Sequence, residues 1–193
     1  MGVSASNKAR PGSVRIIGGD WRSRRIPVPA GVDLRPTPDR VRETLFSWLN
    51  PVLPGSVCLD LFAGTGVLGF EALSRGAARA VFVENHRIAA AALERWQQQL
   101  DAEAAIVCVD AMTYLARPTG GPFDIVFVDP PYAVAVEPVL EALPAMLKPG
   151  ARIYLERARG AAWPATPGLQ WIRQTTAGDV TFGLAAVITA DPV

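Results

Sequence analysis

An aspartate, two prolines and a tyrosine follow a run of strand-forming residues at 125–128. Proline has no backbone N–H, so Pro130 and Pro131 must lie beyond the sheet, in a stiff turn. There the carbonyl oxygen of Pro130 lies near the carboxylate of Asp129, and Tyr132 adds a flat aromatic face. Two acceptors beside a ring suit the exocyclic amine of a nucleic-acid base, which must leave its stack to enter the pocket. We predict that these four residues orient such an amine for attack on a methyl group.

A glycine-rich turn, DLFAGTGVLG, predicts where the methyl group would come from. Gly64, Gly66 and Gly69 have the G-x-G-x-x-G spacing between an apolar strand and a helix, the context in which backbone N–H groups approach a nucleotide. Glu84, at the end of the next strand, is placed to accept both hydroxyls of a ribose. Both NAD and S-adenosylmethionine satisfy these features, and a turn needed only for packing is the alternative.

The carboxylate of Asp60 distinguishes between the two ligands. It lies directly before the glycine turn, where it would repel a pyrophosphate and attract the positively charged amino group of S-adenosylmethionine. Asp110 and Ala111 end the third strand, where the carboxylate could accept from the amino group of adenine. Acids at successive strand ends would surround the crevice in which open α/β sheets bind ligands, so the pattern favours S-adenosylmethionine.

An alternation of strands and helices must position these residues. Apolar runs typical of a covered parallel sheet lie at 56–62, 78–84, 104–110, 123–129 and 151–157. Helices are expected at 67–75, 86–100, 111–117 and 136–147. The chain then ends in two strands joined through Ala177-Gly178-Asp179. The sequence therefore predicts an α/β fold whose mostly parallel sheet ends in an antiparallel hairpin, unlike a dehydrogenase.

The N-terminal part differs in charge from the rest. Residues 1–42 carry nine Lys or Arg and three Asp, a net +6, whereas the remainder is −5. Strand-like pieces at 14–17 and 25–28 flank a turn at 18–20, and an amphipathic helix follows that Thr37 is expected to cap. We expect residues 1–50 to form a basic extension, with a hairpin and a helix, that contacts nucleic acid beside a methyltransferase domain at 51–193; a solvated tail is the alternative.

Composition excludes several classes. No apolar run approaches the ~20 residues of a membrane span, and the first twelve residues lack the apolar segment of a secretory signal. Cys58 and Cys108 lie in apolar runs and are expected to be buried, which argues against disulfides. His86, the single histidine, has no cysteine or histidine cluster around it, so we expect no metal, and a surface role rather than a general base. The expected protein is cytoplasmic and monomeric.

Four segments, in order, resemble one family: RIIGGDWRSRRIPVP, LRPTPDRVRETLFSWL, LDLFAGTGVLGFEALSRGA and FVDPPY. From about Val14 to the final strand, the chain is similar to the bacterial 16S rRNA guanine-N2 methyltransferases that modify guanine 966. The resemblance implies a class I, Rossmann-like fold with a seven-stranded sheet and S-adenosylmethionine as the donor. The implied substrate is 16S rRNA in the small ribosomal subunit or an assembly intermediate.

The resemblance also implies roles for single residues. The donor site would comprise Asp60, Phe62, Ala63, Gly64, Gly66, Glu84, Asp110 and Ala111, and the catalytic residues would be Asp129, Pro130, Pro131 and Tyr132. The RNA-binding residues would be Arg15, Trp21, Arg22, Arg24, Arg25, Arg35, Arg40 and Arg42. Ser23 departs from the family, since a glycine is expected there.

Three alternatives stay open. An adenine-N6 methyltransferase acting on DNA or RNA needs the same tetrapeptide, although the chain has no room for a separate DNA-recognition domain. A non-catalytic RNA-binding module could keep the same fold, but the donor turn and the tetrapeptide are intact. An NAD-linked oxidoreductase is opposed by Asp60 and by the C-terminal hairpin.

Overall fold

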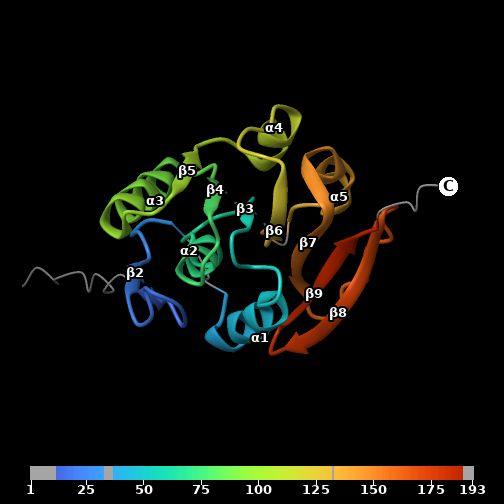
Figure 1. Cartoon of the computed structure of the whole chain (residues 1–193), viewed down its shortest axis with the longest axis horizontal. Helices are drawn as coiled ribbons and strands as arrows, with labels where there is room; N and C mark the ends of the chain where they lie inside the picture. The colour runs from blue at the N-terminus through green and yellow to red at the C-terminus, as the bar shows by residue number, and fades with distance from the viewer. Residues whose placement is uncertain (1–11, 33–36, 132, 189–193) are drawn as a thin grey trace, which may run out of the picture.

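A seven-stranded sheet with the order β5-β4-β3-β6-β7-β9-β8 forms the centre of the molecule (Figure 1). The computed structural model describes residues 12–32, 37–131 and 133–188. The strands are β3 (Val57–Asp60), β4 (Arg79–Val83), β5 (Ala104–Val107), β6 (Phe123–Val128), β7 (Leu147–Ala158), β8 (Leu169–Ala177) and β9 (Val180–Val187). Strands β3 to β7 pair in parallel, and β9 pairs antiparallel with both β7 and β8. The predicted α/β sheet with an antiparallel C-terminal hairpin is confirmed.

Helices cover both faces of this sheet, which explains why its strands are apolar throughout. The helices α1 (Asp39–Leu49), α2 (Val67–Ser74) and α3 (Arg87–Leu100) share one hydrophobic cluster with side chains such as Phe82 and Phe127. The helices α4 (Ala111–Ala116) and α5 (Glu137–Ala142) and a 3-10 turn at Leu143–Met146 pack with Val81 and Val126 on the other face. Neighbouring strand residues therefore belong to different cores, as the pleat requires.

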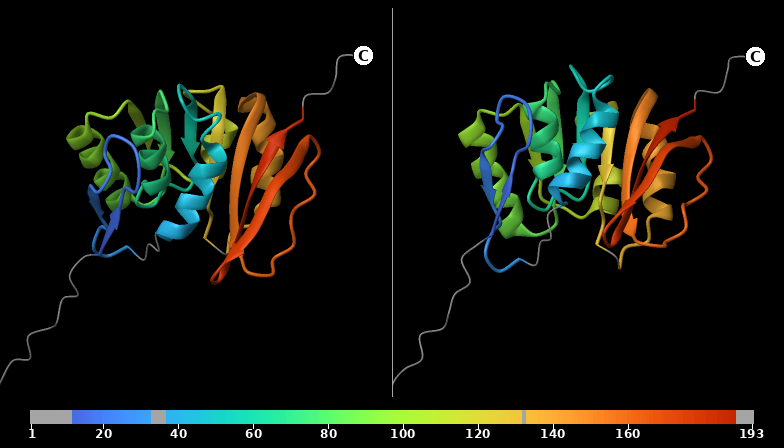
Figure 2. Two further views of the ribbon diagram at one scale, coloured as in Figure 1. Left: turned by 60° about the horizontal axis from the view of Figure 1, so that its bottom comes forward. Right: turned by 90° about the horizontal axis from the view of Figure 1, so that it is seen from below.

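The N-terminal hairpin packs beside α2 and α3 (Figure 2). It consists of β1 (Ser13–Arg15) and β2 (Arg25–Pro27), paired antiparallel. The turn between the strands is a loop over 16–24, longer than the expected turn at 18–20. Ser23 in this loop has a φ of +71°, a left-handed conformation that favours glycine and that accounts for the glycine expected there. Apolar residues of the hairpin belong to the same hydrophobic cluster as those of α1 and α2. The hydrophobic packing is therefore continuous across the expected boundary at residue 50.

Three local expectations were wrong. The helix expected at 136–147 ends as α-helix at Ala142, because Pro144 has no N–H to continue the ladder. Cys108 is exposed, since β5 is a short edge strand that ends at Val107. Thr37 does not cap α1: Pro38 is the N-cap residue, without a side-chain bond. Within the described part of the chain, no helix has the length and apolar character needed to cross a membrane.

Candidate active site

The carboxyl ends of the parallel strands open into one pocket of ≈ 1020 Å³. It lies where the strand order reverses beside β3, the usual ligand position in an open α/β sheet. Its lining includes predicted donor-site and catalytic residues: Asp60, Phe62, Ala63, Gly64, Glu84, Asp110, Ala111, Asp129, Pro130 and Pro131. Gly66 is not part of the lining, and Tyr132 lies outside the described residues. Segments far apart in the sequence thus meet in one cavity.

Gly66 of the donor turn packs closely against the side chain of Leu93. It is the N-cap residue of α2 with a φ of +74°, and a Cβ there would lie 2.4 Å from Cδ2 of Leu93. Gly69, in the first turn of α2, would place a Cβ 2.3 Å from the ring of Phe82. These two glycines let α2 approach β4 and α3 closely. Of the three glycines in the G-x-G-x-x-G pattern, Gly64, with a φ of +52°, lines the pocket.

Glu84 holds the donor turn against the end of β4. Its Oε2 accepts a 2.7 Å hydrogen bond from the N–H of Gly64, and its Oε1 accepts one of 2.7 Å from the N–H of His86. A carboxylate oxygen has two acceptor positions, so both oxygens keep capacity for the hydroxyls of a ribose. His86 is exposed at the start of α3, and its backbone, not its ring, makes this contact.

Asp60 is almost completely buried at the end of β3, with 2% of its surface exposed. Its Oδ2 accepts a 3.0 Å hydrogen bond from the N–H of Gly69, which fixes the first turn of α2 to the strand. Burial raises the pKa of Asp60 to about 7, and the nearby charge of Glu84 adds to the shift. A positive group in the pocket would favour the ionised carboxylate, in line with the role expected from the sequence.

The carboxylate of Asp110 caps the helix that follows it, α4. As N-cap of α4 it accepts a 2.9 Å hydrogen bond from the N–H of Thr113 and another from the hydroxyl of Thr113. These bonds lower the pKa of Asp110. The surrounding lining is apolar, with Phe62, Val109 and Met112 near Ala111. These side chains give this part of the lining an apolar surface.

Asp129 follows β6 and is half-buried in the pocket wall. Its Oδ2 accepts a 3.1 Å hydrogen bond from the hydroxyl of Thr37, which precedes α1. Burial raises the pKa of Asp129, the charge of Glu156 raises it further, and the bond from Thr37 opposes both. Asp129 therefore lies where its carboxylate could accept a hydrogen bond from an amine in the pocket.

Two residues of this wall were missed from the sequence. Glu156 of β7 lines the pocket beside Asp129, and its Oε2 accepts a 2.7 Å hydrogen bond from the hydroxyl of Tyr154. The signal was present: Glu156 is an acid near the end of an apolar strand, like Asp60 and Asp129. The local pattern favours a helix cap for Thr37, and only the fold reveals its bond to Asp129.

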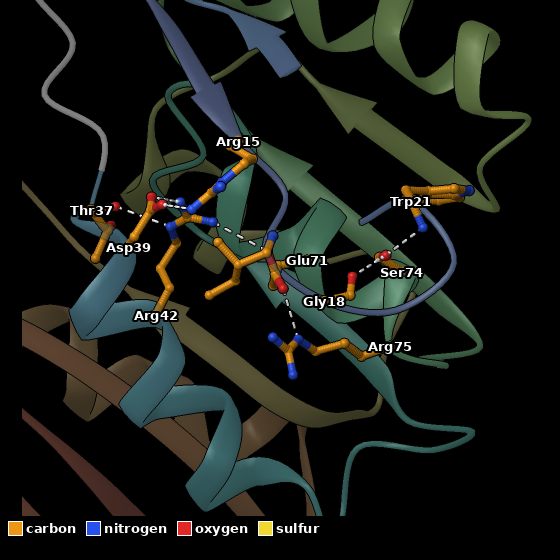
Figure 3. Close-up of polar contacts among 10 residues, drawn as sticks. Arg15, Gly18, Trp21, Thr37, Asp39, Arg42, Glu71, Ser74 and Arg75 are labelled. Atoms are coloured by element: carbon orange, nitrogen blue, oxygen red, sulfur yellow. Dashed lines mark hydrogen bonds and ion pairs between the residues drawn. The ribbon is translucent and has the colours of Figure 1, made fainter. Parts of the chain in front are cut away.

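Arg42, expected to bind RNA, is completely buried, and that expectation was wrong. Its guanidinium donates to the carboxylates of Asp39 and Glu71 and to the carbonyl oxygen of Thr37 (Figure 3). Because all three nitrogens are engaged inside the protein, none is available to a phosphate. Arg42 lies on the same face of α1 as the buried Leu45 and Leu49, and its side chain points toward α2 (Figure 3).

The remaining arginines of the extension differ in their distance from the pocket. Arg15, Arg22, Arg24, Arg25 and Arg40 are exposed, and Trp21 is half-buried; Arg35 lies outside the described residues. The N–H of Trp21 donates 2.9 Å to Oγ of Ser74, at the end of α2 that points away from the glycine turn (Figure 3). The eight residues of α2 span about 12 Å, so the contact of Trp21 with Ser74 lies about one helix length from the glycine turn. Arg40, in the first turn of α1, lies nearer.

Comparisons with known proteins agree with this geometry. The family described as "Conserved hypothetical protein 95" matches residues 14–186. Ribosomal RNA small subunit methyltransferase D of Escherichia coli (strain K12) is 44% identical over 184 residues, which cover 92% of each chain. The Haemophilus influenzae protein of that name is 40% identical over 180 residues, 90% of this chain and 93% of its own.

A solved structure, described as the putative methyltransferase yhhF from Escherichia coli, superposes with a TM-score of 0.83 at 41% identity, covering 91% of this chain and 98% of its own. The range matched by the family, residues 14–186, includes the donor turn and the aspartate-proline corner. The chain belongs to the family of the ribosomal RNA small subunit methyltransferase D proteins.

Proposed function

We propose that this protein transfers a methyl group from S-adenosylmethionine to the exocyclic N2 amine of a guanine in 16S rRNA of the small ribosomal subunit. The observation that carries the proposal is the single pocket in which the donor turn and the Asp129-Pro130 corner meet. Family membership supports the same reaction, since relatives are named as ribosomal RNA methyltransferases. A ribosomal substrate would place the protein, acting as a monomer, in the cytoplasm.

The donor half of the pocket fits S-adenosylmethionine in size and chemistry. The volume of ≈ 1020 Å³ is at the upper end of the range of about 300–1,000 Å³ typical of ligand pockets, enough for a nucleoside and an inserted base. Glu84 would accept the ribose hydroxyls, the wall around Ala111 would cover the adenine, and Asp60 would face the amino group. When bound, S-adenosylmethionine supplies a methyl carbon on a positively charged sulfur, which keeps the bonding electron pair as the amine nitrogen takes the methyl group.

The acceptor half would orient the amine. The lone pair of a guanine N2 amine is delocalised into the ring, so the amine is a weak nucleophile and its alignment decides the rate. The carboxylate of Asp129 and the carbonyl oxygen of Pro130 would each accept one of its N–H groups, and Pro131 would stiffen the turn. We propose that Tyr132 stacks on the base. The proton that the amine loses after transfer would pass to water.

The exposed arginines would position the RNA without reading its sequence. Arg15, Arg22, Arg24, Arg25 and Arg40 are exposed in a segment with a net positive charge, which suits contacts with phosphates. We propose Arg35 for the same role. Specificity for one guanine would then depend on the shape of the subunit around it.

Methyl transfer with identification of the product tests the proposal. Labelled S-adenosylmethionine is incubated with small subunits, naked 16S rRNA and duplex DNA, and the products are digested to nucleosides. The proposal expects label in N2-methylguanosine from the rRNA, and loss of transfer with retained donor binding in Asp129→Ala. Label in N6-methyladenosine would replace guanine with adenine as the target. Donor binding without transfer to any substrate would favour the non-catalytic module.

A further inference from the structure

The hydroxyl of Thr37 connects the N-terminal extension to the acceptor corner. Thr37 is 4% exposed, lines the pocket and donates to Oδ2 of Asp129 across 92 positions of the sequence. It does not cap α1, the usual role of a threonine at such a position. Its hydroxyl therefore acts on Asp129 rather than on the helix that it precedes.

The backbone of Thr37 is itself held in place. Nε of Arg42 donates 3.1 Å to the carbonyl oxygen of Thr37, and Nη1 of Arg42 lies 3.2 Å from Oε2 of Glu71 on α2 (Figure 3). Glu71 also accepts 2.8 Å from the N–H of Ile17 and 2.7 Å from Nε of Arg75. The extension, the donor helix and Thr37 thus share one hydrogen-bond network, at whose centre the side chains of Arg42 and Glu71 are completely buried.

Asp129 has mostly acidic neighbours. The charges of Glu156 on β7 and Asp60 on β3 raise the pKa of Asp129 and so favour its protonated form. The hydroxyl of Tyr154 donates to Glu156. Within the described residues, Thr37 supplies the hydrogen bond that favours the ionised form of Asp129. The bond also fixes Oδ2, so that the other oxygen of Asp129 stays available to an incoming amine.

We propose that Thr37 is a positioning residue for methyl transfer, whose hydroxyl orients the Asp129 side chain through Oδ2 while the buried Arg42–Glu71 pair keeps Thr37 in place. The inference rests on the proposed function. It adds to that function a residue that would act through Asp129. It also explains why α1, a helix of the extension, packs directly against the domain that binds the donor.

Three variants test the proposal. Thr37→Val removes the hydroxyl at nearly constant volume, and Thr37→Ser keeps it. Thr44→Val removes a hydroxyl of α1 that donates to the carbonyl oxygen of Arg40. Thr37→Val should lower kcat about tenfold while leaving the affinity for S-adenosylmethionine unchanged, because the hydrogen bond that orients Asp129 is removed. Since the bond lowers the pKa of Asp129, the acidic limb of the pH–rate profile should move to higher pH. Thr37→Ser should restore both properties, and Thr44→Val should behave as wild type.

A second readout needs no substrate. In a carboxyl ¹³C titration of the folded protein, Thr37→Val should raise the midpoint of Asp129 relative to wild type and to Thr37→Ser. If Thr37→Val does not fold, Thr37→Ala is titrated instead. Wild-type kcat and pH profile in Thr37→Val, an unchanged Asp129 midpoint, or a Thr37→Ser variant as impaired as Thr37→Val would overturn the inference. Wild-type protein that transfers no methyl group would instead remove the proposed function, so the two failures are distinct.

Discussion

Arg42 of α1 and Glu71 of α2 form an ion pair without any exposed side-chain surface, with 3.2 Å between Nη1 and Oε2. Burial lowers the pKa of Arg42, and the charges of Asp39 and Glu71 oppose that shift. A charge at this depth is tolerated only while its partners remain, because an uncompensated buried charge is costly. The pair therefore fixes how the extension sits against the donor helix.

Removing Arg42 should destabilise the protein strongly. Arg42→Met leaves Glu71 buried with fewer partners, and we expect a loss of about 3–5 kcal/mol in the free energy of unfolding. Arg40→Met, an exposed position on the same helix, should change it by no more than about 0.5 kcal/mol. Urea denaturation measures both. Equal effects of the two variants would show that the buried pair adds nothing to stability.

Two glycines with the same backbone angle offer a matched test of the donor turn. Gly66 and Gly55 both have a φ of +74°, but a Cβ at Gly66 would meet Leu93 and Phe70, whereas nothing lies within 4 Å of one at Gly55. Both alanine variants should lose about 1–2 kcal/mol from the left-handed backbone. Gly66→Ala alone should lose more than this and also bind S-adenosylmethionine more weakly. Thermal unfolding and donor titration check this; identical behaviour would contradict the packing role.

The pKa of Asp60 predicts how stability depends on pH. Since the folded pKa of about 7 lies above the ordinary value of 3.8, the neutral form favours the folded state. The contribution of Asp60 to stability is complete below about pH 4 and is lost as the pH rises to 7. Asp60→Asn should therefore gain stability relative to wild type between pH 4 and 7, with no further change above. A stability difference that is constant over this range would contradict the assignment.

The same carboxylate should make donor binding depend on pH. A positively charged donor favours the ionised form, so affinity should rise up to pH 7, by at most about tenfold per unit, with proton release on binding. Calorimetry in buffers of different ionisation enthalpy measures the released proton. The dependence should shrink in Asp60→Asn and persist in Glu94→Gln, an exposed change on α3. Unaltered proton release in Asp60→Asn would assign it to another group.

Charge reversal should separate RNA binding from donor binding. Arg22→Glu with Arg24→Glu should weaken binding to small subunits and reduce the salt dependence of binding, by a slope of about one for each phosphate that the variant no longer neutralises. Affinity for S-adenosylmethionine should stay unchanged, because Arg22 and Arg24 are exposed and are not part of the pocket lining. Arg117→Glu, exposed beyond α4 on the other face of the sheet, serves as the control. If the donor affinity falls as well, the two roles are not separate.

The strands and their acids could be read from the sequence because each depends on local pattern. Apolar runs ending in Asp60, Glu84 or Asp129 predict both a covered strand and its ligand-facing end. The burial of Arg42 was missed because the positive charge of its segment suggested phosphate contacts, although Arg42 lies three and seven positions before the buried Leu45 and Leu49. Its partner Glu71, 29 positions away, could not be read from a local pattern. The role of Thr37 escaped prediction for a similar reason: its partner is 92 positions distant, and the local pattern offered a helix cap instead.

A crystal structure with S-adenosylhomocysteine bound would show whether the donor and acceptor halves of the pocket face each other as proposed. We predict the ribose hydroxyls at Glu84, the adenine beside Ala111 and the sulfur facing the corner formed by Asp129 and Pro130. A ligand bound elsewhere, or one in this pocket with its sulfur turned away from that corner, would contradict the proposed transfer.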